Sequence, residues 1–217
     1  FPYTTLFRSN PFDACALECA LSIPDSDITV VSMGRPQTAG MLKGLTRLGV
    51  GRALLLTDPA FAGADMLATS YVLALAIKRL KPDLVFCGRQ SVDGDTAQVG
   101  PCLSQMLGYS LITNVMKIQS VGEVVSCTSR LGEEAVRTPA LLTVERIGSP
   151  TRVLRTYESS AGKRKCTFVE PSELCGILRA ALHKKRNETE HTESSKKLDE
   201  IWVVGKEPEK ISLYIAE

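Results

Sequence analysis

The sequence predicts an α/β fold: a mainly parallel sheet covered by helices on both faces, with a short antiparallel extension. Three short apolar runs, at residues 28–33, 53–56 and 83–87, are typical of strands that are buried on both faces. Each run is preceded by a segment with apolar residues at helical spacing, at 12–22, 36–48 and 64–80 in turn. This alternation of strand and helix is the βαβ pattern, in which neighbouring strands run parallel.

Local signals mark where these elements begin and end. Pro36 suits the first turn of the second helix, and Gly49 ends that helix. After residue 111 the pattern changes to short strands at 115–119, 124–128 and 135–137, with turns at Gly122 and Gly132. These strands predict the antiparallel extension. Residues 139–144 then form another fully apolar strand.

Composition narrows the class of protein. A chain of 217 residues is long enough for one domain with a real core, and a net charge of +2 gives no support to nucleic acid binding or to a membrane surface. No apolar run reaches the roughly 18 residues that a membrane span needs. The seven cysteines contain no C-x-x-C pair, and both histidines lie in the polar C-terminal third. We therefore expect a chain of the reducing cytoplasm, with no structural metal and with Cys15 and Cys19 in the core.

One stretch, residues 83–101, carries the strongest functional signal. Its strand leads into a polar loop with two glycines, and then into a helix that we expect Asp95 or Thr96 to cap. A loop at a helix N-terminus presents free N–H groups and a positive dipole end to an anion, usually a phosphate. The loop matches neither the dinucleotide fingerprint nor the P-loop, and an ordinary α/β connection would look similar.

The residues themselves resemble a known family. Residues 87–101, with the wording Cys-Gly-Arg-Gln-Ser-Val-Asp-Gly-Asp-Thr-Ala-Gln-Val-Gly-Pro, resemble the nucleotide-binding segment of the electron-transfer flavoprotein beta (small) subunit. Residues 10–13, Asn-Pro-Phe-Asp, resemble the start of its first helix, and residues 30–37 resemble its strand and Gly-Pro turn. The resemblance runs from about Asn10 to about Val144. The loop wording resembles the subgroup that binds a second FAD and bifurcates electrons from NADH, and differs from the more acidic loop of the AMP-binding subgroup.

The resemblance implies a Rossmann-like, adenine-nucleotide-hydrolase-like sandwich with the nucleotide at the carboxyl ends of its strands. The cofactor-binding residues that it implies are Asn10, Pro11, Phe12, Asp13, Met33, Gly34, Gly88, Arg89, Gln90, Ser91, Asp93, Gly94, Asp95, Thr96, Ala97, Gln98 and Val99.

Several of these residues also have a simpler explanation. Helix capping accounts for Asn10 and Asp13 about as well as adenine binding does. Turn formation, ribose hydrogen bonding and capping suit Asp93 and Asp95 better than contact with a phosphate of the same charge. The sequence contains no pattern of catalytic acids, bases or nucleophiles, so redox chemistry would belong to a bound cofactor.

In function, the resemblance implies the small subunit of a heterodimeric electron carrier. It would hold FAD, accept a hydride from NADH, and pass one electron through the alpha subunit to an acyl-CoA dehydrogenase and one to ferredoxin or flavodoxin. Three alternatives remain: a carrier with structural AMP in place of FAD, a nucleotide-binding module without a redox role, and a chain that does not fold as a functional unit.

The two ends of the chain depart from the family pattern. Residues 1–9 resemble foreign, adapter-derived sequence, so we expect the first strand to be missing and a sheet edge to be unpaired. Residues 10–147 form the expected nucleotide-binding domain. After Val144, residues 148–153 resemble a segment found further downstream in the family, which implies that the partner-recognition loop is absent. Residues 148–186 would contain a helix at 171–186. Residues 187–217 read as a polar linker with a strand-like tail at 198–205, faintly similar to the start of the alpha subunit.

Overall fold

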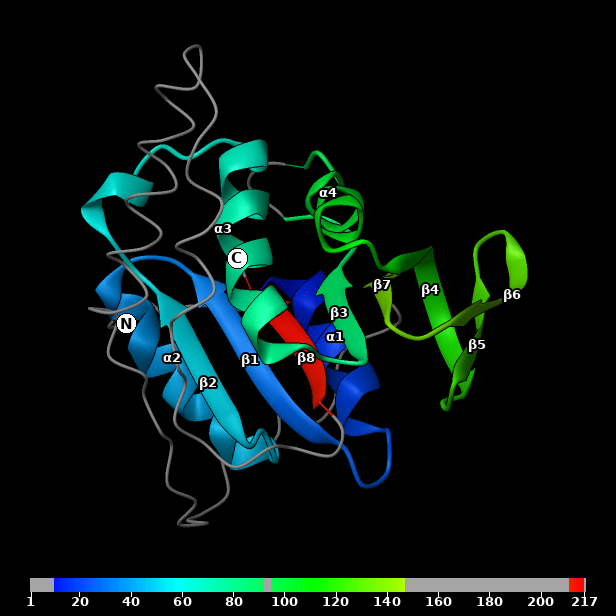
Figure 1. Ribbon diagram of the computed structural model, residues 1–217. Helices are drawn as coiled ribbons and strands as arrows, with labels where there is room; N and C mark the ends of the chain where they lie inside the picture. Colours follow the sequence, from blue (N-terminus) through cyan, green and yellow to red (C-terminus); the bar gives the residue numbers. More distant parts are fainter. Residues whose placement is uncertain (1–9, 92–94, 147–210, 217) are drawn as a thin grey trace, which may run out of the picture.

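The computed structural model describes residues 10–91, 95–146 and, for the backbone alone, 211–216. These residues form an eight-stranded sheet in the order β2-β1-β8-β3-β7-β4-β5-β6 (Figure 1). The strands are β1 Asp27–Met33, β2 Arg52–Leu56, β3 Leu84–Gly88, β4 Ser110–Ser120, β5 Val124–Ser129, β6 Gly132–Arg137, β7 Ala140–Val144 and β8 Ile211–Ala216. The α-helices are α1 Pro11–Leu21, α2 Ala39–Leu45, α3 Met66–Leu80 and α4 Val99–Leu107.

The strand directions confirm the predicted fold class. Neighbours from β2 across to β4 pair parallel, whereas β4 pairs antiparallel with β5, and β5 with β6. The last two strands project from one side of the sandwich in Figure 1. We call β5, β6 and the half of β4 that pairs with β5 the antiparallel extension.

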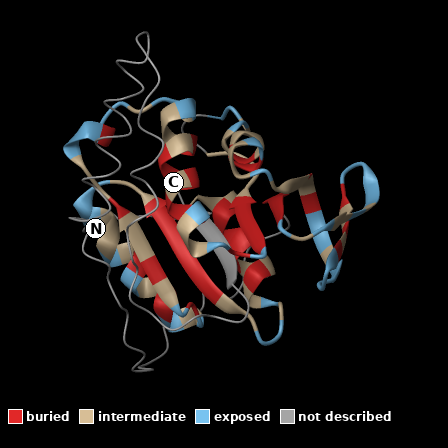
Figure 2. Cartoon of the chain, in the orientation of Figure 1, coloured by how far each residue is buried: buried red, intermediate tan, exposed pale blue. Residues whose placement is uncertain are grey.

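Helices cover both faces of the parallel part of the sheet. Successive residues of a strand point to opposite faces, so the partners of two neighbouring residues identify the helices on each face. Val30 of β1 belongs to the buried cluster that contains Leu17 of α1 and Leu42 of α2. Its neighbour Val31 belongs to the cluster that contains Ile77 of α3 and Leu103 of α4. Figure 2 shows β1 buried along most of its length and the tip of the extension exposed. Burial on both faces explains why these strands read as continuous apolar runs.

The helices expected between residues 12 and 108 are present, with some shifts at their ends. The second is a shorter α2 flanked by 3₁₀ turns at Pro36–Thr38 and Thr46–Leu48. It stops at Gly49, whose φ of 113° favours glycine. The third begins at residue 66, two residues later than expected, because the carboxylate of Asp65 accepts a hydrogen bond from the N–H of Ala68 and caps it.

The expectation of an unpaired sheet edge beside the first strand is wrong. Strand β8 lies between β1 and β3 and pairs parallel with both, from Asp27 to Ser32 on one side and from Leu84 to Cys87 on the other. Among the described residues, β2 and β6 are the edges of the sheet. The sequence did not single out 211–216 as a strand.

Other expectations fall on residues that the structure does not describe: the foreign leader 1–9, the helix at 171–186, the linker from 187 and the strand-like run at 198–205. No helix within the described residues combines the length and the apolar content that crossing a bilayer requires.

Candidate functional site

A shallow hollow, open to solvent, lies where the start of α1, the end of β3 and the start of α4 meet. It lies beyond the carboxyl end of a parallel strand, which is where ligands bind in such sheets. The residues that line it are Asn10, Asp13, Cys87, Gly88, Arg89, Gln90, Ser91, Thr96, Ala97, Gln98, Val99 and Gly100.

Asn10 and Asp13 join the first helix to the loop after β3. The side-chain oxygen of Asn10 accepts a hydrogen bond from the N–H of Phe12 (3.3 Å) and so caps α1, as its alternative explanation required. Its amide nitrogen donates to the backbone oxygen of Gln90 (2.7 Å) and to Asp13 (2.9 Å). The carboxylate of Asp13, which is buried, accepts from the N–H of Gly88 (2.8 Å). Both residues therefore hold one wall of the hollow in place.

Gly88 is a glycine because α1 passes directly over it. A Cβ atom at this position would lie 2.6 Å from the Oδ1 atom of Asp13 and 2.7 Å from the Cβ atom of Phe12. Only a residue without a side chain allows the carboxylate of Asp13 to reach the backbone N–H of residue 88.

The start of α4 differs from the prediction. The helix begins at Val99 with Gln98 at the N-cap and no side-chain capping bond, so capping by Asp95 or Thr96 is wrong. Asp95 and Ala97 have φ angles of 48° and 54°, which keep this segment out of the helix. The carboxylate of Asp95 instead accepts a hydrogen bond from the side-chain amide of Gln90. The N-terminus of α4, with its positive dipole end, is left at the wall of the hollow without a side-chain cap.

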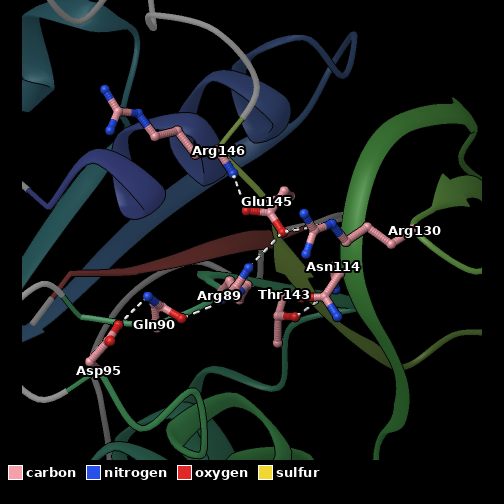
Figure 3. Close-up of polar contacts among 8 residues, drawn as sticks. All are labelled: Arg89, Gln90, Asp95, Asn114, Arg130, Thr143, Glu145 and Arg146. Carbon is pink, nitrogen blue, oxygen red and sulfur yellow. Dashed lines mark hydrogen bonds and ion pairs between the residues drawn. The ribbon is translucent and has the colours of Figure 1, made fainter.

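Arg89 is held from several directions at once. Its backbone N–H donates to the carbonyl of Val144 (2.9 Å), and its Nε atom donates to the side-chain oxygen of Gln90 (3.0 Å). Its Nη1 atom donates to Glu145 (3.0 Å), and its guanidinium lies 5.8 Å from the centre of the Phe12 ring. Figure 3 shows the side chain between Gln90 and Glu145. With 30 % of the side chain exposed, this is a partly buried cation at the hollow.

Some expected site residues lie elsewhere. Met33 ends β1 and Gly34 follows it, where the N–H of Gly34 donates to the carbonyl of Leu56. Neither residue lines the hollow. Pro11, Phe12 and Asp95 are next to the lining residues without being among them, and Asp93 and Gly94 lie outside the described residues.

Sequence reasoning missed Cys87 and Gly100, which line the hollow, and Glu145, which binds Arg89. Glu145 follows β7, so the rule that ligands gather at carboxyl ends could have found it.

The electrostatics centre on Glu145. Burial by itself raises the pKa of this carboxyl group, but hydrogen bonds from Arg89 and the N–H of Arg146, together with the charges of Arg89 and Arg130, outweigh burial and lower it. Glu145 is therefore an anion at neutral pH. In the described part of the chain, no group of three or more histidine, cysteine, aspartate or glutamate side chains is placed to hold a metal ion.

A parallel sheet with helices on both faces and a short antiparallel extension places this chain in the adenine-nucleotide-hydrolase-like class of α/β domains. A family model described as "Electron transfer flavoprotein domain" matches residues 7–163. The chain belongs to that family, on its beta-subunit branch.

Relatives within the family include beta subunits from fermentative bacteria and proteins named FixA. The chain is 47 % identical over 141 residues to the electron transfer flavoprotein subunit beta of Clostridium acetobutylicum, covering 62 % of this chain and 54 % of that protein. It is 36 % identical over 218 residues to protein FixA of Azorhizobium caulinodans, covering 76 % and 78 %. It is 44 % identical over 151 residues to the caffeyl-CoA reductase-Etf complex subunit CarD of Acetobacterium woodii, covering 65 % and 58 %. The chain thus spans little more than half the length of several of these relatives.

Proposed function

We propose that this chain is an electron-transfer subunit that holds an adenine-containing cofactor in the hollow between α1, β3 and α4. The observation that carries the proposal is the meeting of three elements there: the capped start of α1, the glycine at the end of β3, and a helix N-terminus whose capping position carries no side-chain bond. Family membership supports a flavin or AMP as the occupant.

The residues present fit such a group. The N–H groups at the start of α4 would meet a phosphate, because their dipoles point out of the helix end. The guanidinium of Arg89 would contact an anionic or carbonyl group of the cofactor, since it is a fixed cation at the hollow. Asn10 and Asp13 would support the wall rather than bind directly, because their polar atoms already bond Gly88 and Gln90. A bound FAD would supply the redox chemistry, and the protein would supply position and polarity.

In its full form the proposal is a bifurcating carrier. The chain would pair with an electron-transfer flavoprotein alpha subunit, take electrons from NADH, and deliver them to an acyl-CoA dehydrogenase and to ferredoxin or flavodoxin. Two observations favour this form: the loop wording at 87–101, and the likeness to CarD, whose name places it in a complex with a caffeyl-CoA reductase.

The second candidate is a simple carrier with structural AMP. Family membership supports it equally, because it implies flavin or AMP binding without separating the two. In that case the chain is a scaffold whose partner holds the redox centre.

The test is a count of bound nucleotides. The chain is co-expressed with an alpha subunit from a related operon, the complex is purified, and FAD and AMP are released and measured per heterodimer. Two FAD and no AMP support the bifurcating carrier, and NADH reduction is then measured. One FAD and one AMP support the simple carrier and overturn the role of NADH.

A variant pair makes the count specific to this hollow. Arg89→Gln changes a cation that lines it, whereas Arg137→Gln changes an arginine on β6 of the extension. We expect Arg89→Gln to lower the occupancy of the nucleotide that this chain binds. Arg137→Gln should leave that occupancy unchanged. Equal occupancy in both variants, or a complex that carries only the nucleotide of the alpha subunit, would contradict binding at this hollow.

A further inference from the structure

The carboxylate of Glu145 is shared between two arginines that come from distant parts of the chain. Its Oε2 atom lies 3.0 Å from the Nη1 atom of Arg89, in the loop after β3, and 3.5 Å from the Nε atom of Arg130, in the turn between β5 and β6. Only 13 % of the Glu145 side chain is exposed, against 30 % for Arg89 and 60 % for Arg130. Figure 3 shows Glu145 between the two guanidinium groups.

The backbone around Glu145 leaves its side chain little freedom. Its N–H donates to the carbonyl of Val115 (2.9 Å), which ties the end of β7 to β4. Its Oε1 atom accepts a hydrogen bond from the N–H of Arg146 (3.1 Å). One carboxylate oxygen is thereby anchored to the backbone, and the other is presented to the arginines. A partly buried carboxylate fixed in this way orients whichever cation it binds.

Arg89 is the cation that depends on it. Its Nε atom is bound to Gln90 and its Nη1 atom to Glu145, and the Phe12 ring lies beside the guanidinium plane. Within the described residues its Nη2 atom has no hydrogen-bond partner. The planar guanidinium is thus fixed at two corners and leaves donors for a ligand in the hollow that Arg89 lines.

We propose that Glu145 is a positioning residue, which holds the guanidinium of Arg89 in the orientation that binds an anionic or carbonyl group of the nucleotide. This inference rests on the proposed nucleotide site and deepens it. Glu145 itself does not line the hollow, so it acts on the ligand only through Arg89.

Arg130 has a supporting part. Its backbone N–H donates to the carbonyl of Asn114 (3.2 Å). The backbone N–H of Asn114 in turn donates to the hydroxyl of Thr143 (3.0 Å). These bonds fasten the turn of the extension to β4 and β7 beside Glu145. Because Arg130 is largely exposed, its ion pair contributes less than that of Arg89.

The test is a double-mutant cycle read by nucleotide affinity. The full chain and its variants Arg89→Gln, Glu145→Ala and Arg89→Gln with Glu145→Ala are titrated calorimetrically with FAD and, separately, with AMP. We expect each single substitution to raise Kd about tenfold, the factor that corresponds to one charge-assisted hydrogen bond. In the chain that already lacks Arg89, Glu145→Ala should change Kd by less than about twofold, because the effect of Glu145 passes through Arg89.

Two further variants separate positioning from a general loss of structure. Glu145→Gln keeps an oxygen that can accept from Arg89 and should recover part of the affinity. Glu134→Ala is the matched control: this carboxylate on β6 is hydrogen-bonded to Ser129, away from the hollow, and its loss should leave Kd unchanged. Thermal unfolding of every variant shows whether a change in affinity merely follows a change in stability.

The outcomes are distinct. If Glu145→Ala weakens binding equally with and without Arg89, its role is structural and the inference is overturned while nucleotide binding stands. If Arg89→Gln leaves Kd unchanged, Arg89 does not bind the nucleotide and the inference is again overturned. If the unmodified chain binds neither FAD nor AMP, the proposed site itself falls, and the inference falls with it.

Discussion

The close approach of Gly100 to Thr143 allows a direct test of how tightly α4 packs on the sheet. A Cβ atom at Gly100 would lie 2.5 Å from the Cγ2 atom of Thr143 and 3.1 Å from the Sγ atom of Cys87. Ordinary contact begins near 3.4 Å, so Gly100→Ala must push α4 and β7 apart by about 0.9 Å. Thr143 cannot simply rotate away, because its hydroxyl accepts a hydrogen bond from the N–H of Asn114 (3.0 Å).

The magnitude follows from two opposing effects. Overpacking a buried site costs about 1–3 kcal/mol, while alanine in a helix gains about 0.5–1 kcal/mol over glycine. We therefore expect Gly100→Ala to lower the free energy of unfolding by about 1–2 kcal/mol. Thr143→Ser removes the offending methyl group and keeps the hydroxyl, at a cost of about 0.8 kcal/mol for one buried methyl. The double variant should be more stable than the sum of the two single changes predicts, by at least about 1 kcal/mol.

The assay is equilibrium urea unfolding of all three variants, with Gly40→Ala as the matched control. Gly40 is an exposed glycine in α2, and a Cβ atom there would meet nothing within 4 Å. Alanine at Gly40 should therefore raise stability by about 0.5–1 kcal/mol. The reasoning would be refuted if Gly100→Ala were as stable as the original chain, or if Thr143→Ser gave no relief.

Three further predictions concern the site and the half-buried thiol of Cys19. Gly88→Ala should lower the free energy of unfolding by about 3 kcal/mol and also weaken nucleotide binding. The new Cβ atom would lie 2.8 Å from the backbone nitrogen of Asp13, and a backbone atom cannot rotate out of the way as a side chain can. Unchanged urea unfolding and nucleotide titration curves would contradict this prediction. The lowered pKa of Glu145 makes its charge stabilising at neutral pH and less so as the pH falls through the folded-state pKa. Glu145→Gln should accordingly be less stable than the original chain at pH 7 and match it in strong acid, and a difference that persists there would point to packing instead. Burial first, and then the neighbouring Cys15 and Glu18, raise the pKa of the Cys19 thiol to about 11. Because the thiolate is the reactive form, iodoacetamide at pH 8 should label Cys19 in urea and leave it unlabelled in the folded chain. Peptide mass spectrometry measures the labelling.

Interpretation of the sequence succeeded where local pattern decides structure. The continuous apolar run of β1 follows from burial on both faces of the sheet, and the apolar residues of α3 recur at helical spacing because one face of the helix is buried. The spacing of apolar residues therefore identifies both elements. Asn10 could likewise be predicted as a cap, because a short polar side chain before Pro11 is a local signal.

It failed where distant residues decide local conformation. The start of α4 was placed too early because the φ angles of Asp95 and Ala97, on which the true start depends, leave no composition signal, since neither residue is glycine. The bond between the side chains of Asp95 and Gln90 replaces the expected cap, and it exists only once the loop is folded.

By itself, the sequence determined the fold class, the order of strands and helices from Pro11 to Val144, and the segment on which a nucleotide site is proposed. These follow from hydrophobic period, turn residues and motif wording, all of which are local along the chain. Only the tertiary structure decided that β8 completes the sheet between β1 and β3, that α1 closes over Gly88, and that Glu145 reaches Arg89 across 56 positions. Such contacts join residues far apart in sequence, and their free energy comes from packing and charge pairing that exist only when the strands are assembled.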